Sequence, residues 1–157
     1  MTTTVQQVHE TYKKTIPVFR IVKDPTTIQS AKVVNSKEVA DYMRQFWDDG
    51  SMEVCESFYM ITLNRANNIT GYTLVSKGGI SGTVVDVRII CKYAIENLCS
   101  GVIVAHNHPS GNLNFSQADI NISKKLKEAL KIMDIDLLDS LVLTEESYRS
   151  MADNGIL

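Results

Sequence analysis

Short hydrophobic runs alternate with amphipathic stretches along most of the chain. Runs rich in β-branched and aromatic residues predict four strands, at residues 57–63, 69–75, 102–105 and 135–143. Hydrophobic positions at helical spacing predict one helix before these strands, at residues 35–49, and two between them, at 87–98 and 116–133. Strands interleaved with helices are typical of an α/β sandwich with a mixed central sheet, which is the fold class we expect.

Local signals at the element boundaries agree with this pattern. Asn35 followed by Glu38 resembles a capping box at the start of the first helix. The pair Asn67-Asn68 separates the first two predicted strands and indicates a hairpin. Residues 106–115 are predicted to form a loop. Within it, Asn107 either shapes the loop or donates a hydrogen bond beside the site, and the pattern favours the first.

Residues 1–34 differ in character from the rest of the chain. They are mostly polar, with short hydrophobic runs that predict small strands at 17–23 and 31–34. Regular helical and strand patterns begin at residue 35 and continue to the end of the chain. We therefore expect an N-terminal arm over residues 1–34 and a single domain over residues 35–157.

Composition and charge narrow the classes of function. Hydrophobic residues make up 44% of the 157 residues, as is usual for a globular protein with one core. The net charge of −2 does not favour general binding to phosphate backbones, which needs many positive contacts. Three cysteines without a C-x-x-C pair indicate neither a disulfide framework nor a zinc ribbon. With no signal-peptide or membrane-spanning pattern, we expect a cytoplasmic protein without a membrane partner.

Two histidines and an aspartate follow the third predicted strand. His106 and His108 are two positions apart, so both side chains project to the same side of an extended backbone, which Pro109 favours at His108. Asp119 lies in the first turn of the last predicted helix, where its carboxylate can face the same strand end. A His, His, Asp set leaves the fourth position of a tetrahedral zinc open for water, as catalytic sites do. The sequence therefore predicts one zinc ion per chain.

Ser116 completes a specific spacing. Seven residues separate it from His108 and two separate it from Asp119, which gives H-x-H-x7-S-x2-D. This spacing resembles the JAMM (MPN+) motif of zinc hydrolases at every defined position. The resemblance implies that Ser116 donates a hydrogen bond to the developing oxyanion. It also implies that a glutamate beside an upstream strand, here Glu56, takes the proton from water as the general base.

A wider resemblance covers residues 35–157. The chain is similar to the RadC family of bacterial JAB-domain proteins in the segments Glu56-Ser-Phe, Asp86-Val-Arg88, His106-Asn-His-Pro-Ser-Gly111, Leu137-Leu138-Asp139 and Tyr148-Arg-Ser150. The resemblance implies a JAB1/MPN-like, cytidine-deaminase-like α-β-α sandwich and a metallopeptidase or isopeptidase that acts on a peptide or protein. Because the family is associated with DNA repair, the alternative is a DNA-associated accessory protein in repair or mobile-element maintenance.

The chain departs from the RadC pattern in two places. Ser140 stands where the family usually has a histidine after the Leu-Leu-Asp segment. The helix-hairpin-helix segment that precedes the domain in full-length RadC proteins is not expected here, since residues 1–34 have a different pattern. A homodimer, formed through an exposed strand or through the predicted helix near Trp47, is a further expectation.

Several alternatives stay open for the candidate residues. Ser116 and Asp119 also form an ordinary capping box. Glu53, three positions before Glu56, is the second candidate for the general base. A metal-binding scaffold without activity is a third reading of the site. A lysine-rich face of the last helix is predicted to be solvated rather than to bind DNA; it comprises Lys124, Lys125, Lys127 and Lys131.

Overall fold

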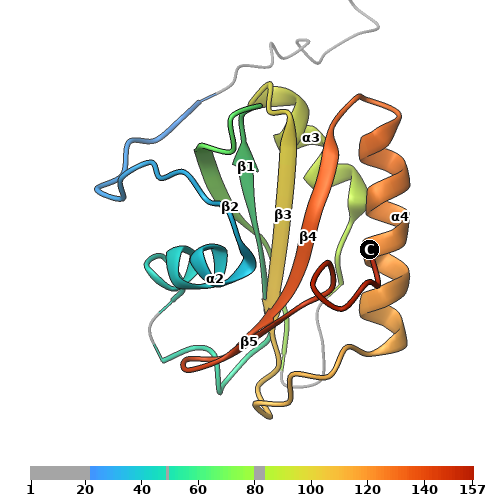
Figure 1. Ribbon diagram of the computed structural model, residues 1–157. Coiled ribbons are helices and arrows are strands. Elements are labelled where there is room, and N and C mark those ends of the chain that lie inside the picture. The colour runs from blue at the N-terminus through green and yellow to red at the C-terminus, as the bar shows by residue number, and fades with distance from the viewer. Residues whose placement is uncertain (1–21, 49, 80–83) are drawn as a thin grey trace, which may run out of the picture.

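The computed structural model describes residues 22–48, 50–79 and 84–157. In these ranges a mixed sheet of five strands lies between α2 on one face and α3 and α4 on the other (Figure 1). The elements in chain order are α2 (Ser36–Arg44), β1 (Ser57–Leu63), β2 (Ile69–Lys77), α3 (Val87–Glu96), β3 (Gly101–Asn107), α4 (Gln117–Lys131), β4 (Asp136–Leu143) and β5 (Tyr148–Ser150). The predicted α/β sandwich with a mixed sheet is confirmed.

The strand order β2-β1-β3-β4-β5 places β3 in the middle of the sheet. β1 pairs antiparallel with β2 and β3, and β5 pairs antiparallel with β4. β3 and β4 run parallel, and α4 forms the crossover between them. The last residues of β3 and the first turn of α4 therefore lie at the same end of the sheet (Figure 1).

The side chains of β3 alternate between two hydrophobic cores. Ile103 and Ala105 belong to the core on the α2 side, whereas Val104 belongs to the core formed with α3 and α4. Since successive side chains of a strand point to opposite faces, His106 lies on the α3 and α4 side and Asn107 on the α2 side. This alternation sends the first predicted metal ligand toward the helix that carries Asp119.

The start of α2 has the predicted cap. The Asn35 side-chain oxygen accepts a hydrogen bond from the Glu38 amide at 2.9 Å. The helix ends at Arg44, short of the predicted residue 49. Trp47 is nevertheless buried, with its ring centroid 4.5 Å from that of Tyr59. Trp47 is therefore a core residue.

Strand predictions at both ends of the chain need correction. The expected strand at 31–34 is a single bridge between Lys32 and Asn68, flanked by hydrogen bonds from the Val33 amide to the Asn67 carbonyl and from the Ile69 amide to the Ala31 carbonyl. Most of the strand expected at 17–23 lies outside the described residues, and residues 22 and 23 have no regular structure. Near the other end, β5 was not predicted, since three residues are too few to show a hydrophobic period.

The hydrophobic face predicted for α3 is wrong at its last position. Leu98 continues the helical spacing, but α3 ends at Glu96. The backbone of Leu98 has a φ of 50°, and its side chain is 89% exposed. A left-handed residue commonly follows a helix end and turns the chain away, so the periodicity of the helix no longer applies there.

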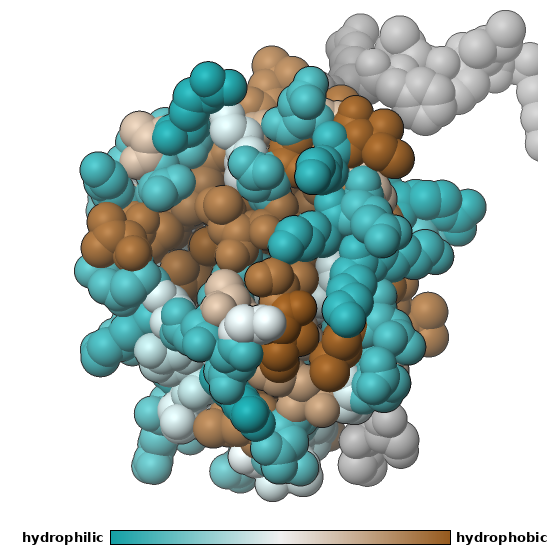
Figure 2. Space-filling model, turned by 45° about the vertical axis from the view of Figure 1, so that its right-hand side comes forward, coloured by the Kyte–Doolittle hydropathy of each residue, from teal (hydrophilic) through white to brown (hydrophobic). Residues whose placement is uncertain are grey.

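The outer face of α4 is solvated, as predicted. Figure 2, in which the right-hand side of Figure 1 is turned forward, shows hydrophilic side chains over much of this side, with hydrophobic ones gathered beside them. All four lysines of the predicted solvated face are exposed: Lys124, Lys125, Lys127 and Lys131. Among the described residues, every helix is too short or too polar to cross a membrane.

Candidate metal centre

His106 lies near the end of β3, the central strand of the sheet. Its backbone lies between Phe58 of β1 and Val142 of β4. Its imidazole is buried and lies nearly parallel to the Phe58 ring, with the centroids 6.0 Å apart and an interplanar angle of 9°. Its Nδ1 is buried without a hydrogen-bond partner among the described residues, so packing orients the ring.

His108 follows the end of β3 by one residue and is fixed by the turn after it. Gly111 has a φ of +72°, and its amide donates to the His108 carbonyl at 2.8 Å. The chain thereby returns so that the Asn112 carbonyl lies 2.6 Å from His108 Nδ1. Because a carbonyl oxygen only accepts hydrogen bonds, Nδ1 carries the proton and the lone pair of Nε2 is free to bind a metal.

Asp119 is oriented by the capping box that begins α4. The Ser116 amide donates to Asp119 Oδ2 at 2.6 Å, and the Asp119 amide donates to Ser116 Oγ at 3.1 Å. Burial alone would raise the pKa of the Asp119 carboxyl. The hydrogen bond and charge interaction with His106 and the hydrogen bonds with Ser116 lower this pKa by more than burial raises it. The resulting pKa is well below the usual range, so the carboxylate is ionised at neutral pH.

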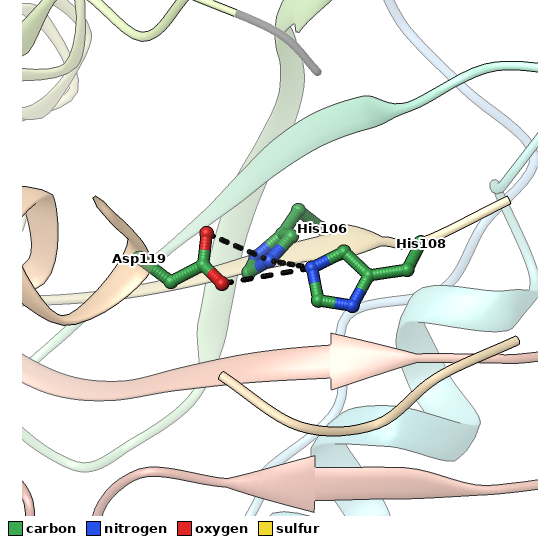
Figure 3. Close-up of side chains that lie close together, drawn as sticks. All are labelled: His106, His108 and Asp119. Atoms are coloured by element: carbon green, nitrogen blue, oxygen red, sulfur yellow. Dashed lines mark hydrogen bonds and ion pairs between the residues drawn. The ribbon is translucent and has the colours of Figure 1, made fainter. Parts of the chain in front are cut away.

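The nitrogen and oxygen atoms of these three side chains converge (Figure 3). The two Nε2 atoms of His106 and His108 lie 3.1 Å apart. Asp119 Oδ1 lies 3.3 Å from His106 Nε2, and Asp119 Oδ2 lies 3.6 Å from His108 Nε2. Two ligand atoms that are each about 2.05 Å from a tetrahedral zinc lie about 3.3 Å apart. The donor set and its spacing therefore fit a zinc ion.

The structure places the two candidate bases differently. Glu56 directly precedes β1 and is held by its backbone: its amide donates to the Gly79 carbonyl at 3.1 Å, and its carbonyl accepts from the Gly78 amide at 2.8 Å. Among the described residues, the metal-binding group contains the two histidines and Asp119 but not the Glu56 carboxylate. Glu53 is exposed and lines a hollow of about 380 Å³ together with His108.

Asn107 is not the loop residue that the sequence favoured. It is the last residue of β3, and it is fully buried. Its Oδ1 accepts from the Ser57 amide at 2.8 Å, and its Nδ2 donates to the carbonyls of Met52 at 2.7 Å and Cys55 at 2.9 Å. The partners lie about 50 positions away along the chain, so no local pattern could identify them.

Ser140 lies on the same face of the sheet as His106. It pairs with Val104, two positions before His106, and is buried. The Ser123 hydroxyl of α4 donates to Ser140 Oγ at 3.0 Å. Ser140 therefore links β4 to α4 but does not belong to the group of converging metal ligands.

A second hollow, of about 690 Å³, lies beside β2 at the opposite edge of the sheet from β5. Tyr42, Phe46 and Tyr72 are among its lining residues. None of the predicted catalytic or metal-binding residues lines it. The smaller hollow is lined by His108 but by neither His106 nor Asp119.

Comparison with known proteins agrees with this geometry. Residues 33–156 match the family described as the RadC-like JAB domain. A UPF0758 protein of Flavobacterium johnsoniae is 50% identical over 101 residues, which are 64% of this chain and 44% of the relative. UPF0758 proteins of Porphyromonas gingivalis (36% over 103 residues, 65% of this chain and 45% of the relative) and Syntrophomonas wolfei (32% over 143 residues, 90% and 56%) are also similar.

The chain spans about half the length of these curated relatives. The family match covers both histidines, Asp119 and the strands and helices that position them. The chain belongs to the family of RadC-like JAB domains.

Proposed function

We propose that the chain is a zinc-dependent hydrolase that cleaves an amide bond in a peptide or protein. The observation that carries the proposal is the convergence of two imidazole nitrogens and a carboxylate at spacings of 3.1 to 3.6 Å. Three ligands of this type leave one position of a tetrahedral site open to solvent or substrate, which distinguishes catalytic from structural zinc sites. Membership of the JAB-domain family supports a metal-dependent hydrolase.

The three proposed ligands are held by different parts of the fold. His106 would hold zinc from the paired end of the central strand, and His108 from a turn in which Asn112 fixes the imidazole tautomer. Asp119 would contribute the negative charge that offsets part of the charge of the cation. When bound, zinc supplies Lewis acidity, which lowers the pKa of a water molecule toward neutrality and polarises a carbonyl group.

Glu56 is the proposed general base. Its bonds with Gly78 and Gly79 hold its backbone beside the end of β2, two positions before Phe58. Phe58 in turn contacts the His106 ring. The Glu56 carboxylate would take a proton from the attacking water and pass it to the leaving amine.

Ser116 is the proposed oxyanion donor. Its Oγ accepts a hydrogen bond from the Asp119 amide, so the hydroxyl proton is not used by that bond. The side chain is exposed at the amino end of α4, where backbone amides also favour negative charge. A donor of this kind would stabilise negative charge that develops on the substrate carbonyl oxygen.

Metal content provides the first test. Elemental analysis of the purified chain after zinc loading and removal of free metal should find one zinc per chain. Almost no zinc should remain bound to the variants His106→Ala, His108→Ala and Asp119→Ala. Ser110 lines the hollow beside His108 but is not a proposed ligand, so Ser110→Ala should keep the metal. A wild-type chain that holds no divalent metal after loading would overturn the proposal.

Turnover provides the second test. A screen of peptide and isopeptide substrates should yield a substrate that the zinc-loaded wild type cleaves. Glu56→Gln should keep zinc and lose turnover by about 100-fold or more, as general bases do. Glu53→Gln should keep both. A reversed result, in which Glu53→Gln loses turnover and Glu56→Gln does not, would assign the base to the residue beside the hollow.

A further inference from the structure

Asn107 lies between the two histidine ligands but points the other way. His106 faces the core formed with α3 and α4, whereas the alternation of β3 directs Asn107 to the opposite side. There it is fully buried, although a buried amide is costly unless its polar atoms find partners. The side chain therefore has a function other than filling hydrophobic space.

Both polar atoms of the Asn107 side-chain amide form hydrogen bonds to one short segment of backbone. Oδ1 accepts from the Ser57 amide at 2.8 Å. Nδ2 donates both hydrogens, to the carbonyls of Met52 at 2.7 Å and Cys55 at 2.9 Å. The three bonded residues lie on both sides of Glu56 in the sequence. No other side chain among the described residues makes three bonds to the segment 52–57.

The backbone of Glu56 is thus held from two directions. Asn107 fixes its neighbours Cys55 and Ser57 to the strand of the histidines, and the end of β2 fixes Glu56 itself through Gly78 and Gly79. Bonds to fixed partners limit how far the segment can move relative to β3. Asn107 is therefore the side chain that ties the segment around Glu56 to the ligand strand, beside the backbone bonds of Gly78 and Gly79 and the pairing of β1 with β3.

We propose that Asn107 is a positioning residue that holds Glu56 in register with the metal ligands. This inference rests on the proposed function, since it assigns Asn107 a part in the same reaction. Asn107 touches neither metal nor substrate. It acts through the segment 52–57, so its loss should displace the general base while the ligand set stays intact.

The substitution Asn107→Asp tests the proposal with a side chain of the same size. A carboxylate oxygen would then replace Nδ2 and face the carbonyl oxygens of Met52 and Cys55, which repel it. Asn68→Asp is the matched control, because Asn68 lies in the β1–β2 turn at the other end of the sheet and its side chain contacts Asn64. Asn107→Ser is a second variant, which removes the bonds without adding charge.

Three measurements on the full chain separate positioning from general support. Hydrogen–deuterium exchange of residues 51–57 should become about tenfold faster or more in both Asn107 variants. Zinc affinity, measured by competition with a chelator, should stay at the wild-type value. On the substrate found by the screen, kcat should fall about 100-fold with KM unchanged. The control should match the wild type in all three.

Two outcomes would overturn the proposal. Unchanged exchange in residues 51–57 would show that Asn107 does not hold the segment. Loss of zinc affinity together with faster exchange would show that Asn107 supports the whole strand end rather than Glu56. A failure to find hydrolysis would count against the proposed function. Exchange and zinc affinity are measured without a substrate, so these two measurements would still show whether Asn107 holds the segment 52–57.

Discussion

Arg149 lies over the ring of Phe115, with its guanidinium carbon 5.3 Å from the ring centroid. The same side chain donates from Nη1 to Asn114 Oδ1 at 2.7 Å. Arg149 belongs to β5, whereas Asn114 and Phe115 belong to the turn between His108 and α4. This turn also contains Asn112, whose carbonyl fixes the His108 ring. The edge strand therefore holds the turn that orients two of the proposed ligands.

Replacing Arg149 should weaken zinc binding although the residue is not a ligand. Arg149→Ala removes a cation–π contact and a hydrogen bond, together worth about 1 kcal/mol of unfolding free energy. Looser ligand support should lower zinc affinity about tenfold. Urea denaturation and chelator competition measure the two effects. Arg88→Ala, which removes a 90% exposed side chain paired with Asp86, should change neither zinc affinity nor the turn. Equal zinc affinity in Arg149→Ala and Arg88→Ala would contradict the inference that β5 supports the ligand turn.

Ser116 can be tested separately as a helix cap and as an oxyanion donor. Glycine is only a few tenths of a kcal/mol worse than serine as an N-cap, so Ser116→Gly should barely change the unfolding free energy. The backbone amide that orients Asp119 remains. If the hydroxyl stabilises the oxyanion, kcat should fall about 100- to 1000-fold. Ser116→Thr keeps a hydroxyl and should retain most of the activity. Full activity in the glycine variant would leave Ser116 with the structural role alone.

Asp139 makes the stability of the fold depend on pH. Its carboxylate accepts from the Ser150 hydroxyl at 2.6 Å and from the amides of Ser140 at 2.7 Å and Ala152 at 3.0 Å. Burial outweighs these bonds and raises the pKa of Asp139 above its ordinary value of 3.8. A raised pKa means that the folded chain binds the proton more tightly than the unfolded chain. The free energy of unfolding should therefore fall as pH rises from 3.8 through the raised pKa.

The substitution Asp139→Asn should remove this fall. An amide oxygen can accept the two backbone bonds, and the amide nitrogen can donate to Ser150 Oγ. Urea denaturation between about pH 4 and pH 7 should show the wild type losing stability relative to the variant as pH rises. Asp134→Asn removes one charge at an exposed position and should follow the wild type. Parallel curves for wild type and Asp139→Asn would contradict the assignment.

Leu98 offers a site at which the chain can be stabilised. Its φ of 50° is unfavourable for an L-residue with a large side chain, and its hydrophobic surface is 89% exposed. Leu98→Gly should raise the free energy of unfolding by about 0.5 to 1 kcal/mol, because glycine adopts this conformation without steric cost. Leu98→Ala keeps the backbone penalty and should give no comparable gain. Thermal or urea unfolding of the two variants would distinguish them.

Elements with strong local signals were predictable. The caps at Asn35 and Ser116 each involve residues three positions apart, and both occur in the structure. β3 contains the continuous hydrophobic run at residues 102–105, and β1 has the predicted bounds. Even the convergence of His106, His108 and Asp119 follows from a strand, a turn and a helix start that are close together in the sequence.

Features that depend on distant partners were not predictable. Asn107 has an ordinary amide side chain, and its function is visible only when the segment 52–57, about 50 positions away, lies beside it. β5 is too short to show a period and exists because β4 offers an open edge. Leu98 matches the helical pattern but follows the point at which the backbone turns.

The ligand set is divided between a rigid and an adjustable part of the molecule. His106 is anchored on both sides by neighbouring strands, whereas His108 lies beyond the last pair of β3 in a turn closed by Gly111. A cation of larger radius needs longer bonds, and the sheet cannot widen to provide them. The turn must absorb that change. In the proposed site, accommodation of a larger cation would therefore depend on residues 109–115, a segment whose residues belong to neither core.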